Sequence, residues 1–386
     1  MNLKYIFTLL NSQKKFRFPK KSDVLLYDDH GIDLMKLLFS KNDFSILNTR
    51  KEIIHLPILI ICLLNFKFKL DDYFFYFIKY VDPKIIVTHN DNYISFYNLA
   101  RRFKNKKFIA IQRSVRSYHN DIYSLFKNNF KINGTTKFSI EKFFVYNKQT
   151  QKEFNKYVDA NFEVIGSAIA NNNKPKIKTN EVISWVSNYV RTTDNKSIFY
   201  TGTDDVLKKD IKIKSIKLVG VINNFCKSRK LKFNILAKMN PLVDGPELVA
   251  QEKKFYEGFL SNERFNLIEN KHRDNFKELD RSAIVIGEVS NLLYESIFRG
   301  NKTFFLNLYP DHKILNTKRF GYLAGYPSIG PFWANSTSSS IEESLDKILK
   351  MTKDQWENTI NTYNPELIYF DENNSKLKDY FKSEGF

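Results

Sequence analysis

Short apolar runs alternate with stretches of helical spacing along this chain of 386 residues. Uninterrupted runs rich in Val and Ile are typical of strands that are buried on both faces of a parallel sheet. Residues 282–307 (SAIVIGEVSNLLYESIFRGNKTFFLN) predict a complete unit: a strand at 283–286, a turn at 287–291, a helix to Phe298 and a second strand at 303–306. Such units build doubly wound sheets, which bind ligands outside the carboxyl ends of their strands.

The same alternation recurs on both sides of this unit and predicts an α/β fold. A chain of this length is too long for one ordinary core and fits two domains. The polar run 171–181 lacks apolar periodicity, so we place the boundary there, with domains at 1–170 and 181–386. Whether the last helices pack back on the N-terminal domain stays open. Further strands are predicted at 24–27, 44–47, 84–88, 107–111, 142–147, 162–165, 181–186, 232–237 and 265–268, and helices at 32–39, 72–80, 94–103, 150–157, 210–226, 253–259, 341–351, 356–363 and 376–382.

Residues 287–295 carry the first candidate site. The predicted helix begins at the loop that follows Gly287 and contains Ser290 and Asn291, so its free backbone N–H groups suit a phosphate. Glu295 follows about one turn later, where a carboxylate can accept a hydrogen bond from a ribose hydroxyl. These residues are therefore candidates for binding a donor nucleotide. In the competing interpretation Ser290 only caps the helix and Glu295 is a solvated helix residue.

Polar residues also follow two other predicted strands of the C-terminal half. Ser187 and Asn188 come after the strand at 181–186, and Lys238 comes after the strand at 232–237. Because the carboxyl ends of parallel strands meet at one edge of a sheet, we add these residues to the candidate donor site. The Lys238 ammonium suits a diphosphate counter-charge, although a solvent-facing lysine is the commoner case.

The first predicted strand ends in two carboxylates, Asp28 and Asp29, and His30 follows them. A carboxylate at the carboxyl end of a strand suits general-base work on an acceptor hydroxyl. We therefore take Asp28 and Asp29 as catalytic candidates and His30 as a candidate for binding an acceptor or a phosphate. Capping of the following helix is the alternative role for the two aspartates.

The loop after the strand at 107–111 is rich in cations and polar groups. It contains Gln112, Arg113, Arg116 and His119. Because Arg presents a planar fork of donors that fits a phosphate or a carboxylate, we assign these four residues to an acceptor- or phosphate-binding site. Ordinary surface charge is the competing interpretation.

The formal net charge of +19 indicates anionic partners without naming them. The sequence has no zinc-finger spacing, RNA-binding aromatic block, Walker loop, G-x-G-x-x-G or metal-ligand spacing, so we predict no nucleic acid partner, no nicotinamide cofactor and no metal. Cys62 and Cys226 cannot make a disulfide framework and fit a reducing cytoplasm. The longest apolar stretch, 53–64, is shorter than the roughly 20 residues of a spanning helix.

A basic cluster near the N-terminus surrounds Phe16 and Phe18. Contact with an anionic inner membrane is one interpretation of this cluster, and a solvated loop is the other. We expect a cytoplasmic protein, with peripheral contact to the inner membrane as an open alternative. The cations of the cluster are Lys14, Lys15, Arg17, Lys20 and Lys21.

Residues 290–302 resemble the donor-binding stretch of GT-B glycosyltransferases in bacterial surface polysaccharide synthesis. The family pattern is Ser-Thr-Leu-Gly-Tyr-Glu-Ala-x-x-Arg-Gly-x-Lys between two strands; here Asn291 replaces Thr and Leu293 replaces Gly. Residues 27–31 (YDDHG) and 330–333 (GPFW) resemble two other blocks of surface carbohydrate biosynthesis proteins, whereas residues 112–114 (QRS) depart from the family's Gln-Asn-Gly. The positions in register with the donor pattern are Ser290, Leu292, Tyr294, Glu295, Arg299, Gly300 and Lys302.

The resemblance implies a GT-B-like α/β fold, with two Rossmann-like domains facing a cleft. It implies that the C-terminal domain binds a nucleotide sugar and the N-terminal domain a glycan or lipid-linked glycan acceptor, without a metal or other cofactor. CMP-linked Kdo or nonulosonate donors suit related transferases. Three alternatives stay open: a transferase of glycerol phosphate or a similar group onto a polymer, a nucleotide-sugar epimerase, and a non-catalytic subunit of a polysaccharide assembly complex.

Overall fold

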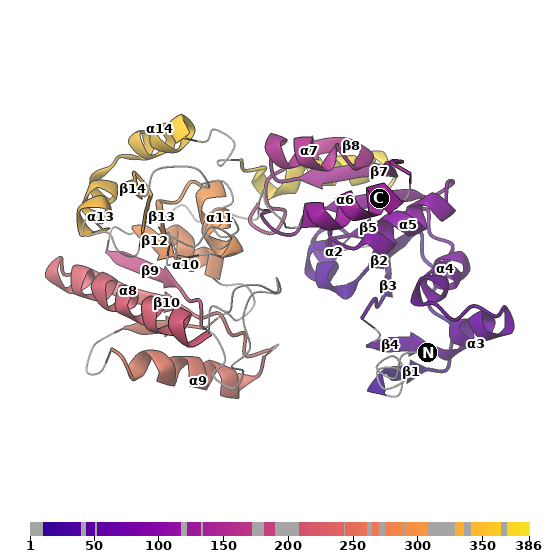
Figure 1. The fold of residues 1–386 in the computed structure, drawn as a ribbon, viewed down its shortest axis with the longest axis horizontal. Helices are drawn as coiled ribbons and strands as arrows, with labels where there is room; N and C mark the ends of the chain where they lie inside the picture. Colours follow the sequence, from indigo (N-terminus) through magenta and orange to yellow (C-terminus); the bar gives the residue numbers. More distant parts are fainter. Residues whose placement is uncertain are drawn as a thin grey trace. The chain divides into compact units, whose positions relative to one another are not determined.

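The chain divides into two compact units (Figure 1). Unit 1 comprises Met1–Ser114, Ile122–Asn172 and Asp371–Phe386, and unit 2 comprises Val115–Asp121 and Asn173–Phe370. His119 and most of the predicted linker, 172–180, lie outside the described residues. The structure, a computed structural model, describes residues 11–39, 44–50, 52–116, 122–132, 134–171, 181–189, 208–242, 244–260, 265–269, 275–288, 290–307, 329–335, 341–363 and 369–386.

Six parallel strands form the main sheet of unit 1, in the order β3-β2-β5-β6-β7-β8. Successive side chains of a strand point to opposite faces of a sheet. Leu25 and Tyr27 therefore join one core, whereas Val24 and Leu26 join a second core on the other face. Burial on both faces explains why these strands are uninterrupted apolar runs. The strands are β2 (Val24–Tyr27), β3 (Phe44–Leu47), β5 (Ile85–Thr88), β6 (Lys107–Ile111), β7 (Phe138–Val145) and β8 (Val158–Val164).

Helices cover both faces of this sheet. On one face they contribute aromatic rings to the core, such as Tyr97 and Phe126 with ring centroids 5.0 Å apart. On the other face α15 packs beside α2, and the ring centroids of Phe39 and Phe381 lie 4.9 Å apart. The chain thus returns to unit 1 for its last helix. The helices are α2 (Ile32–Leu38), α3 (Leu56–Leu64), α4 (Leu70–Val81), α5 (Ile94–Arg102), α6 (Ile122–Ile132), α7 (Lys148–Phe154) and α15 (Ser375–Ser383), and β1 (Gln13–Lys15) pairs with β4 (Ile53–His55) in a small separate sheet.

Seven strands form the sheet of unit 2, in the order β11-β10-β9-β12-β13-β15-β14. All neighbours are parallel except the short β14 and β15 pair. The strands are β9 (Val182–Val186), β10 (Lys232–Leu236), β11 (Asn266–Ile268), β12 (Ile284–Gly287), β13 (Thr303–Asn307), β14 (Ile329–Gly330) and β15 (Trp333–Asn335), and the helices are α8 (Lys208–Ser228), α9 (Pro246–Glu257), α10 (Asn275–Arg281), α11 (Asn291–Phe298), α13 (Ile341–Lys350) and α14 (Lys353–Tyr363).

Each main sheet reverses its strand order beside its first strand. In unit 1 the chain adds β3 on one side of β2 and then β5 on the other side. In unit 2 it adds β10 on one side of β9 and later β12 on the other. Ligands of doubly wound sheets bind at such a reversal, outside the carboxyl ends of the strands. The candidate ligand-binding positions are therefore the carboxyl ends of β2 and β5 and those of β9 and β12.

The predicted elements of the described residues are confirmed, with shifted ends in several cases. β2, β3 and β6 have the predicted bounds, and α11 ends at Phe298 as predicted, whereas β7 begins four residues before the predicted position 142, at Phe138. The pattern did not predict the helices α3, α6 and α10 or the short strands β1, β4, β14 and β15. α3 lacks a helical period because all of its residues are apolar or small. Within the described ranges, no helix combines the length and apolar character needed to cross a membrane.

Gly330 packs against the ring of Trp333 where β14 leads into β15. A Cβ atom at position 330 would overlap the indole ring. Trp333 is buried, and its ring centroid lies 4.8 Å from that of Phe332 and 5.2 Å from that of Tyr363. The GPFW block therefore has a packing role at this end of the sheet.

We expect Gly330→Ala to lower the free energy of unfolding by about 1–3 kcal/mol, because an added methyl group in a filled space displaces its neighbours. Gly220→Ala is the matched control: nothing lies within 4 Å of a Cβ built at Gly220 in α8. There alanine should stabilise the helix by about 0.5–1 kcal/mol. Denaturant unfolding measures both, and equal effects of the two changes would contradict the packing argument.

Candidate functional site

Two predicted donor segments meet at the strand-order reversal of unit 2. Asn188, beyond the end of β9, donates from Nδ2 to Oε2 of Glu288 at 2.8 Å. Glu288 directly follows β12 and is buried, and its other carboxylate oxygen accepts a hydrogen bond from Ser215 of α8. One buried carboxylate thus ties together the end of β9, the end of β12 and α8. Glu288 is not among the residues predicted from the sequence, although its position directly after a predicted strand is a signal that indicates a site residue.

The last residue of β12 is small because α11 passes close to it. A Cβ atom on Gly287 would lie 3.0 Å from a methyl carbon of Leu293 and 3.2 Å from Cβ of Val186. α11 then begins at Ser290, whose backbone is extended and whose Oγ accepts a hydrogen bond from the N–H of Leu292 at 3.2 Å. Ser290 is therefore an N-cap, and its carbonyl also accepts a hydrogen bond from the N–H of Leu293 at 3.1 Å, so α11 begins soon after the end of β12 at the reversal.

Asn291 and Glu295 occupy the first turns of α11. Oδ1 of Asn291 accepts a hydrogen bond from the backbone N–H of Val115 at 3.2 Å. Glu295 is only 7% exposed, so it is not the solvated helix residue of the competing interpretation. A carboxylate with so little exposure to solvent needs hydrogen-bond or ionic partners, so a polar environment at Glu295 is expected. Ribose binding by Glu295 stays a prediction.

A buried ion pair fixes the far end of α11. Nε of Arg299 donates to Oδ1 of Asp280 at 2.9 Å, and a second guanidinium nitrogen contacts Oδ2. Asn301 adds a hydrogen bond from Nδ2 to Oδ1 of Asp280 at 2.8 Å. Such a bidentate pair sets orientation as well as energy. Arg299, which matches the family pattern, therefore positions the helix that carries Ser290 and Glu295.

A second buried carboxylate, Glu252 of α9, joins the ends of β9 and β10. It accepts hydrogen bonds from Ser187 Oγ and from the backbone N–H groups of Lys238 at 3.0 Å and Met239 at 2.9 Å. Burial raises the pKa of Glu252, and these hydrogen bonds offset part of that effect. Nζ of Lys238 donates to the backbone carbonyl of Tyr189 at 3.1 Å, so the predicted cation is held on the loop after β9.

In unit 1, the residues after β2 form a hydrogen-bonded pair. Oδ1 of buried Asp28 accepts from Nδ1 of His30 at 2.6 Å and from the backbone N–H of His30 at 2.9 Å. Oδ1 of Asp29 lies 3.1 Å from the same Nδ1. The His30 side chain is 23% exposed, and its Nε2 makes no hydrogen bond within the part of the chain that the structure describes. A carboxylate that holds Nδ1–H leaves Nε2 as the proton acceptor.

Hydrogen bonds keep the Asp28 carboxyl charged despite its burial. Burial raises its pKa, but the backbone N–H of His30, the hydroxyl of Thr49 at 2.7 Å and the imidazole of His30 lower it more, so the pKa lies below its ordinary value. Nε of Arg50 lies 3.9 Å from Oδ2. Asp28 also has a φ of 84°, which non-glycine residues rarely adopt. Several contacts therefore hold a strained backbone at the end of β2.

The ends of β5 and β6 are joined to this region by polar contacts. Thr88 Oγ1 donates to the carbonyl of Tyr27 at 3.2 Å. Oδ1 of buried Asp91 accepts from the backbone N–H of Arg113 at 3.1 Å. The loops after β2, β5 and β6 thus lie along one edge of the sheet, as their parallel pairing requires.

Gln112 uses both ends of its carboxamide inside unit 1. Nε2 donates to the carbonyl of Ser114 at 2.7 Å, and Oε1 accepts from the backbone N–H of Tyr146 at 2.7 Å. Gln112 therefore orders the loop that carries Arg113. Arg116 is buried and groups with unit 2, and His119 lies outside the described residues, so a common acceptor site for these residues stays a prediction.

Asp28, Asp29 and His30 also offer three possible metal-ligand atoms within 4.8 Å of one another. The sequence predicted no metal, because it contains no HExxH motif and no Cys/His metal-ligand spacing. Nδ1 of His30 and Oδ1 of Asp28 are already hydrogen-bonded to each other, so the arrangement of these three residues is explained without a metal ion. Metal-independent chemistry stays a prediction.

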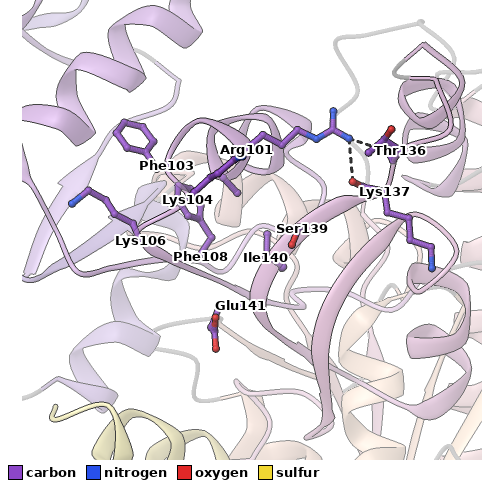
Figure 2. Close-up of a pocket in the computed structure, with 11 residues that line it drawn as sticks. Arg101, Phe103, Lys104, Lys106, Phe108, Thr136, Lys137, Ser139, Ile140 and Glu141 are labelled. Atoms are coloured by element: carbon purple, nitrogen blue, oxygen red, sulfur yellow. Dashed lines mark hydrogen bonds between the residues drawn. The ribbon is translucent and has the colours of Figure 1, made fainter.

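A hollow of about 690 Å³ lies near the amino ends of β6 and β7, at the other edge of the unit 1 sheet (Figure 2). Two of its cations are engaged in the fold. Figure 2 shows the guanidinium of Arg101 reaching the carbonyls of Thr136 and Lys137, at 2.8 and 3.2 Å, and Lys106 pairs with Asp82 at 2.5 Å. The hollow is therefore separate from the Asp28 and His30 pair.

A family model described as "putative O-antigen biosynthesis protein" matches residues 109–385, more than half of the chain. Among curated protein sequences, none matches. Among solved structures, a variant of the wall teichoic acid polymerase TagF is 10% identical with a TM-score of 0.51, over 94% of this chain and 89% of that one. A UDP-N-acetylglucosamine 2-epimerase is 14% identical with a TM-score of 0.51, over 95% and 97%. The UDP-GlcNAc 2-epimerase from Neisseria meningitidis is 12% identical with a TM-score of 0.49, over 93% and 99%.

At these identities the likeness shows the fold alone. The two structures with a TM-score of 0.51 are GT-B proteins with two Rossmann-like domains, and each unit of this chain has its own largely parallel sheet. The predicted GT-B-like α/β fold is therefore confirmed.

The lowered pKa of Asp28 predicts a loss of stability in acid. A carboxyl whose pKa is lower in the folded than in the unfolded state stabilises the fold above the unfolded value, and this stabilisation is lost as pH falls through the folded value. Below about pH 4, the free energy of unfolding should therefore fall more steeply in the wild type than in Asp28→Asn. Chemical denaturation at neutral pH and at about pH 3 measures the difference.

Thr49→Val serves as the companion variant, because it removes one hydrogen bond to the carboxylate. It should destabilise the protein at neutral pH and have a smaller effect in acid. In the Asp28→Asn background the same change should add little. Parallel pH dependence of the wild type and Asp28→Asn would contradict the assignment.

Proposed function

Because the chain belongs to this family of O-antigen biosynthesis proteins, we propose that it is a glycosyltransferase. It moves a sugar from a nucleotide-activated donor to a surface polysaccharide or a lipid-linked glycan. The observation that carries the proposal is the N-terminus of α11, which lies at the strand-order reversal of unit 2 beside a buried polar network.

In this proposal the C-terminal domain, 181–386 apart from its returning last helix, binds the donor. The N-terminus of α11, which begins at Asn291, binds the donor phosphates in this proposal: its backbone N–H donates to phosphate oxygens, and a helix N-terminus carries partial positive charge. Lys238 supplies a further counter-charge, and Glu295 accepts a ribose hydroxyl. Ser187 and Asn188 hydrogen bond to the buried carboxylates of Glu252 and Glu288, so they shape the loop that contacts the nucleotide.

The N-terminal domain, 1–170, binds the acceptor in this proposal. Asp28 is too buried to reach an acceptor hydroxyl, whereas His30 is partly exposed with Nε2 available. We therefore assign proton abstraction to Nε2 of His30 and the orientation of its ring to Asp28. Asp29 stays a catalytic candidate beside the same imidazole, and Arg113 stays a candidate for contacting the acceptor.

The chemical step transfers the sugar in one displacement if the enzyme inverts. Nε2 of His30 takes the proton of the acceptor hydroxyl, and the oxygen attacks the anomeric carbon. The bond between that carbon and the donor phosphate oxygen breaks, and the nucleotide leaves with the electron pair. The N–H groups of α11 and Lys238 stabilise the charge that develops on the phosphate.

The donor nucleotide can be identified before any transfer assay. CMP-linked Kdo or nonulosonate is one donor class for this proposal. Thermal-shift measurements with CMP, CDP, UDP and GDP identify the nucleotide, because a ligand that binds only the folded state raises its melting temperature. Product analysis then distinguishes a glycosidic bond from a phosphodiester or an epimerised donor.

Glu295→Gln tests the donor site. We expect this change to weaken binding of the identified nucleotide by about 1.5–3 kcal/mol, the usual contribution of a hydrogen bond to a charged group. Isothermal titration calorimetry measures it. Glu343→Gln is the control: Glu343 is an exposed residue of α13, and its replacement should leave the affinity unchanged. Unchanged affinity in a folded Glu295→Gln variant would remove Glu295 from the site.

His30→Gln and Asp28→Asn test the proposed base. Each should lower the transfer rate by about a hundredfold or more, the usual range for losing a general base, with nucleotide affinity retained. Asp33→Asn, an exposed carboxylate in α2, should keep the wild-type rate. Wild-type rates in His30→Gln would show that the base lies elsewhere, whereas loss in Asp28→Asn alone would favour the carboxylate itself.

A further inference from the structure

Helix α3 is apolar on every side, although only one side is covered. Its sequence, LPILIICLL, contains no charged residue. Ile58 and Cys62 are buried in the unit 1 core, whereas Ile60, Leu63 and Leu64 are exposed, Leu64 by 73%. The three exposed residues follow the three- and four-residue spacing of one helix face. Surface helices normally place polar residues on that face, so this arrangement needs an explanation.

The turn after α3 continues the exposed apolar surface. Phe66 is 81% exposed and Phe68 is exposed too. Phe66 has a φ of 55°, in the left-handed region, at the position after the helix where Gly or Asn is usual. A bulky residue is rare in this conformation. An aromatic ring is therefore present where neither local backbone preference nor burial in the described chain favours it.

The segment after β1 lies beside the start of α3. β1 pairs with β4, which leads directly into α3, and Nδ1 of His55 donates to the carbonyl of Arg17 at 2.8 Å. Phe18 stacks on Tyr80 with ring centroids 4.3 Å apart, while Phe16 is 83% exposed. Figure 1 shows β1, β4 and α3 grouped together below the six-stranded sheet of unit 1. We call residues 13–21 and 56–69 the α3 surface.

The α3 surface carries charge of one sign only. It contains no Asp or Glu. An open hollow of about 460 Å³ lies beside β1, lined by Gln13, Lys15, Phe16 and Arg17, so two cations and an exposed ring meet there. The cations of the surface are Lys14, Lys15, Arg17, Lys20, Lys21, Lys67 and Lys69.

We propose that the α3 surface docks on a membrane that contains anionic phospholipids. Exposed apolar side chains next to Lys and Arg are the features of segments that lie in the membrane interface. The exposed apolar side chains of α3 enter the boundary between headgroups and acyl chains, together with the rings of Phe66 and Phe68. The cations of the α3 surface bind headgroup phosphates. α3 has nine residues, too few to cross a bilayer, so it lies in the interface.

Charge complementarity favours a membrane over a second copy of the chain or an RNA. Two copies of the α3 surface would oppose like charges. A single-stranded RNA would stack on the rings but would leave Ile60, Leu63 and Leu64 in water. This inference does not depend on the proposed transfer activity, because the surface is defined without the Asp28 or Ser290 regions.

Vesicle flotation with the full chain tests the proposal. We expect binding to phosphatidylcholine vesicles that contain phosphatidylglycerol, weaker binding at high salt, and little binding to pure phosphatidylcholine. Leu64→Ser/Phe66→Asn and Lys67→Glu/Lys69→Glu should each lower the partition coefficient about tenfold or more. Asn is tolerated at the left-handed position, so the first variant should stay folded.

Leu242→Ser/Phe259→Ser is the control, because both residues are exposed apolar residues of unit 2. It should bind vesicles like the wild type. Wild-type binding in both α3-surface variants, or no binding of the wild type to anionic vesicles, would overturn the proposal. A dimer that the Leu64→Ser/Phe66→Asn change dissociates, or a complex with single-stranded RNA in place of vesicle binding, would overturn it in favour of that partner.

Discussion

Parallel pairing around β2 and β9 is the constraint on which both candidate sites depend: the Asp28 and His30 pair of unit 1 and the polar network around Glu288 of unit 2. In a parallel sheet all carboxyl ends lie at one edge, and the first strand of each main sheet has later strands on both sides. Asn188 and Glu288 are 100 positions apart in sequence, yet β9 and β12 make them hydrogen-bonded neighbours. A slip of one residue in register would turn every side chain of a strand to the opposite face, which would disrupt the core and this polar network together.

Buried carboxylates hold the loops at these edges. Asp28, Glu252 and Glu288 are all nearly inaccessible to solvent, and each accepts hydrogen bonds from more than one element. Burial of a charge is unfavourable unless hydrogen bonds compensate for lost hydration. The loops must therefore keep the conformations that supply those bonds. Ser187, Lys238 and His30 gain fixed positions from this requirement, which favours a preorganised site over one assembled on ligand binding.

The longer strands of the two main sheets and the helix α11 could be predicted because their signals are local. Val24–Tyr27 and Lys107–Ile111 are uninterrupted apolar runs, and Ser290 and Gly300 mark the two ends of the α11 region. The role of Glu252 could not be predicted, because a Glu within a helix is usually solvated and its burial depends on the distant pairing of β9 and β10. The adjacency of Asp28 and His30 was visible in sequence. Which of the two side chains reaches solvent depends on the tertiary turn that the chain makes after β2.

The return of α15 to unit 1 gives this chain an order of folding during synthesis. Leu377 and Phe381 complete the core that Val24 and Leu26 begin on one face of the unit 1 sheet. On the ribosome these two residues emerge only after the whole of unit 2. Domains generally fold as they leave the ribosome, but here one face of the first sheet stays without the cover of α15 until unit 2 has been synthesised. A nascent chain that stalls in unit 2 therefore presents an open apolar face, which makes it a substrate for chaperones and proteases.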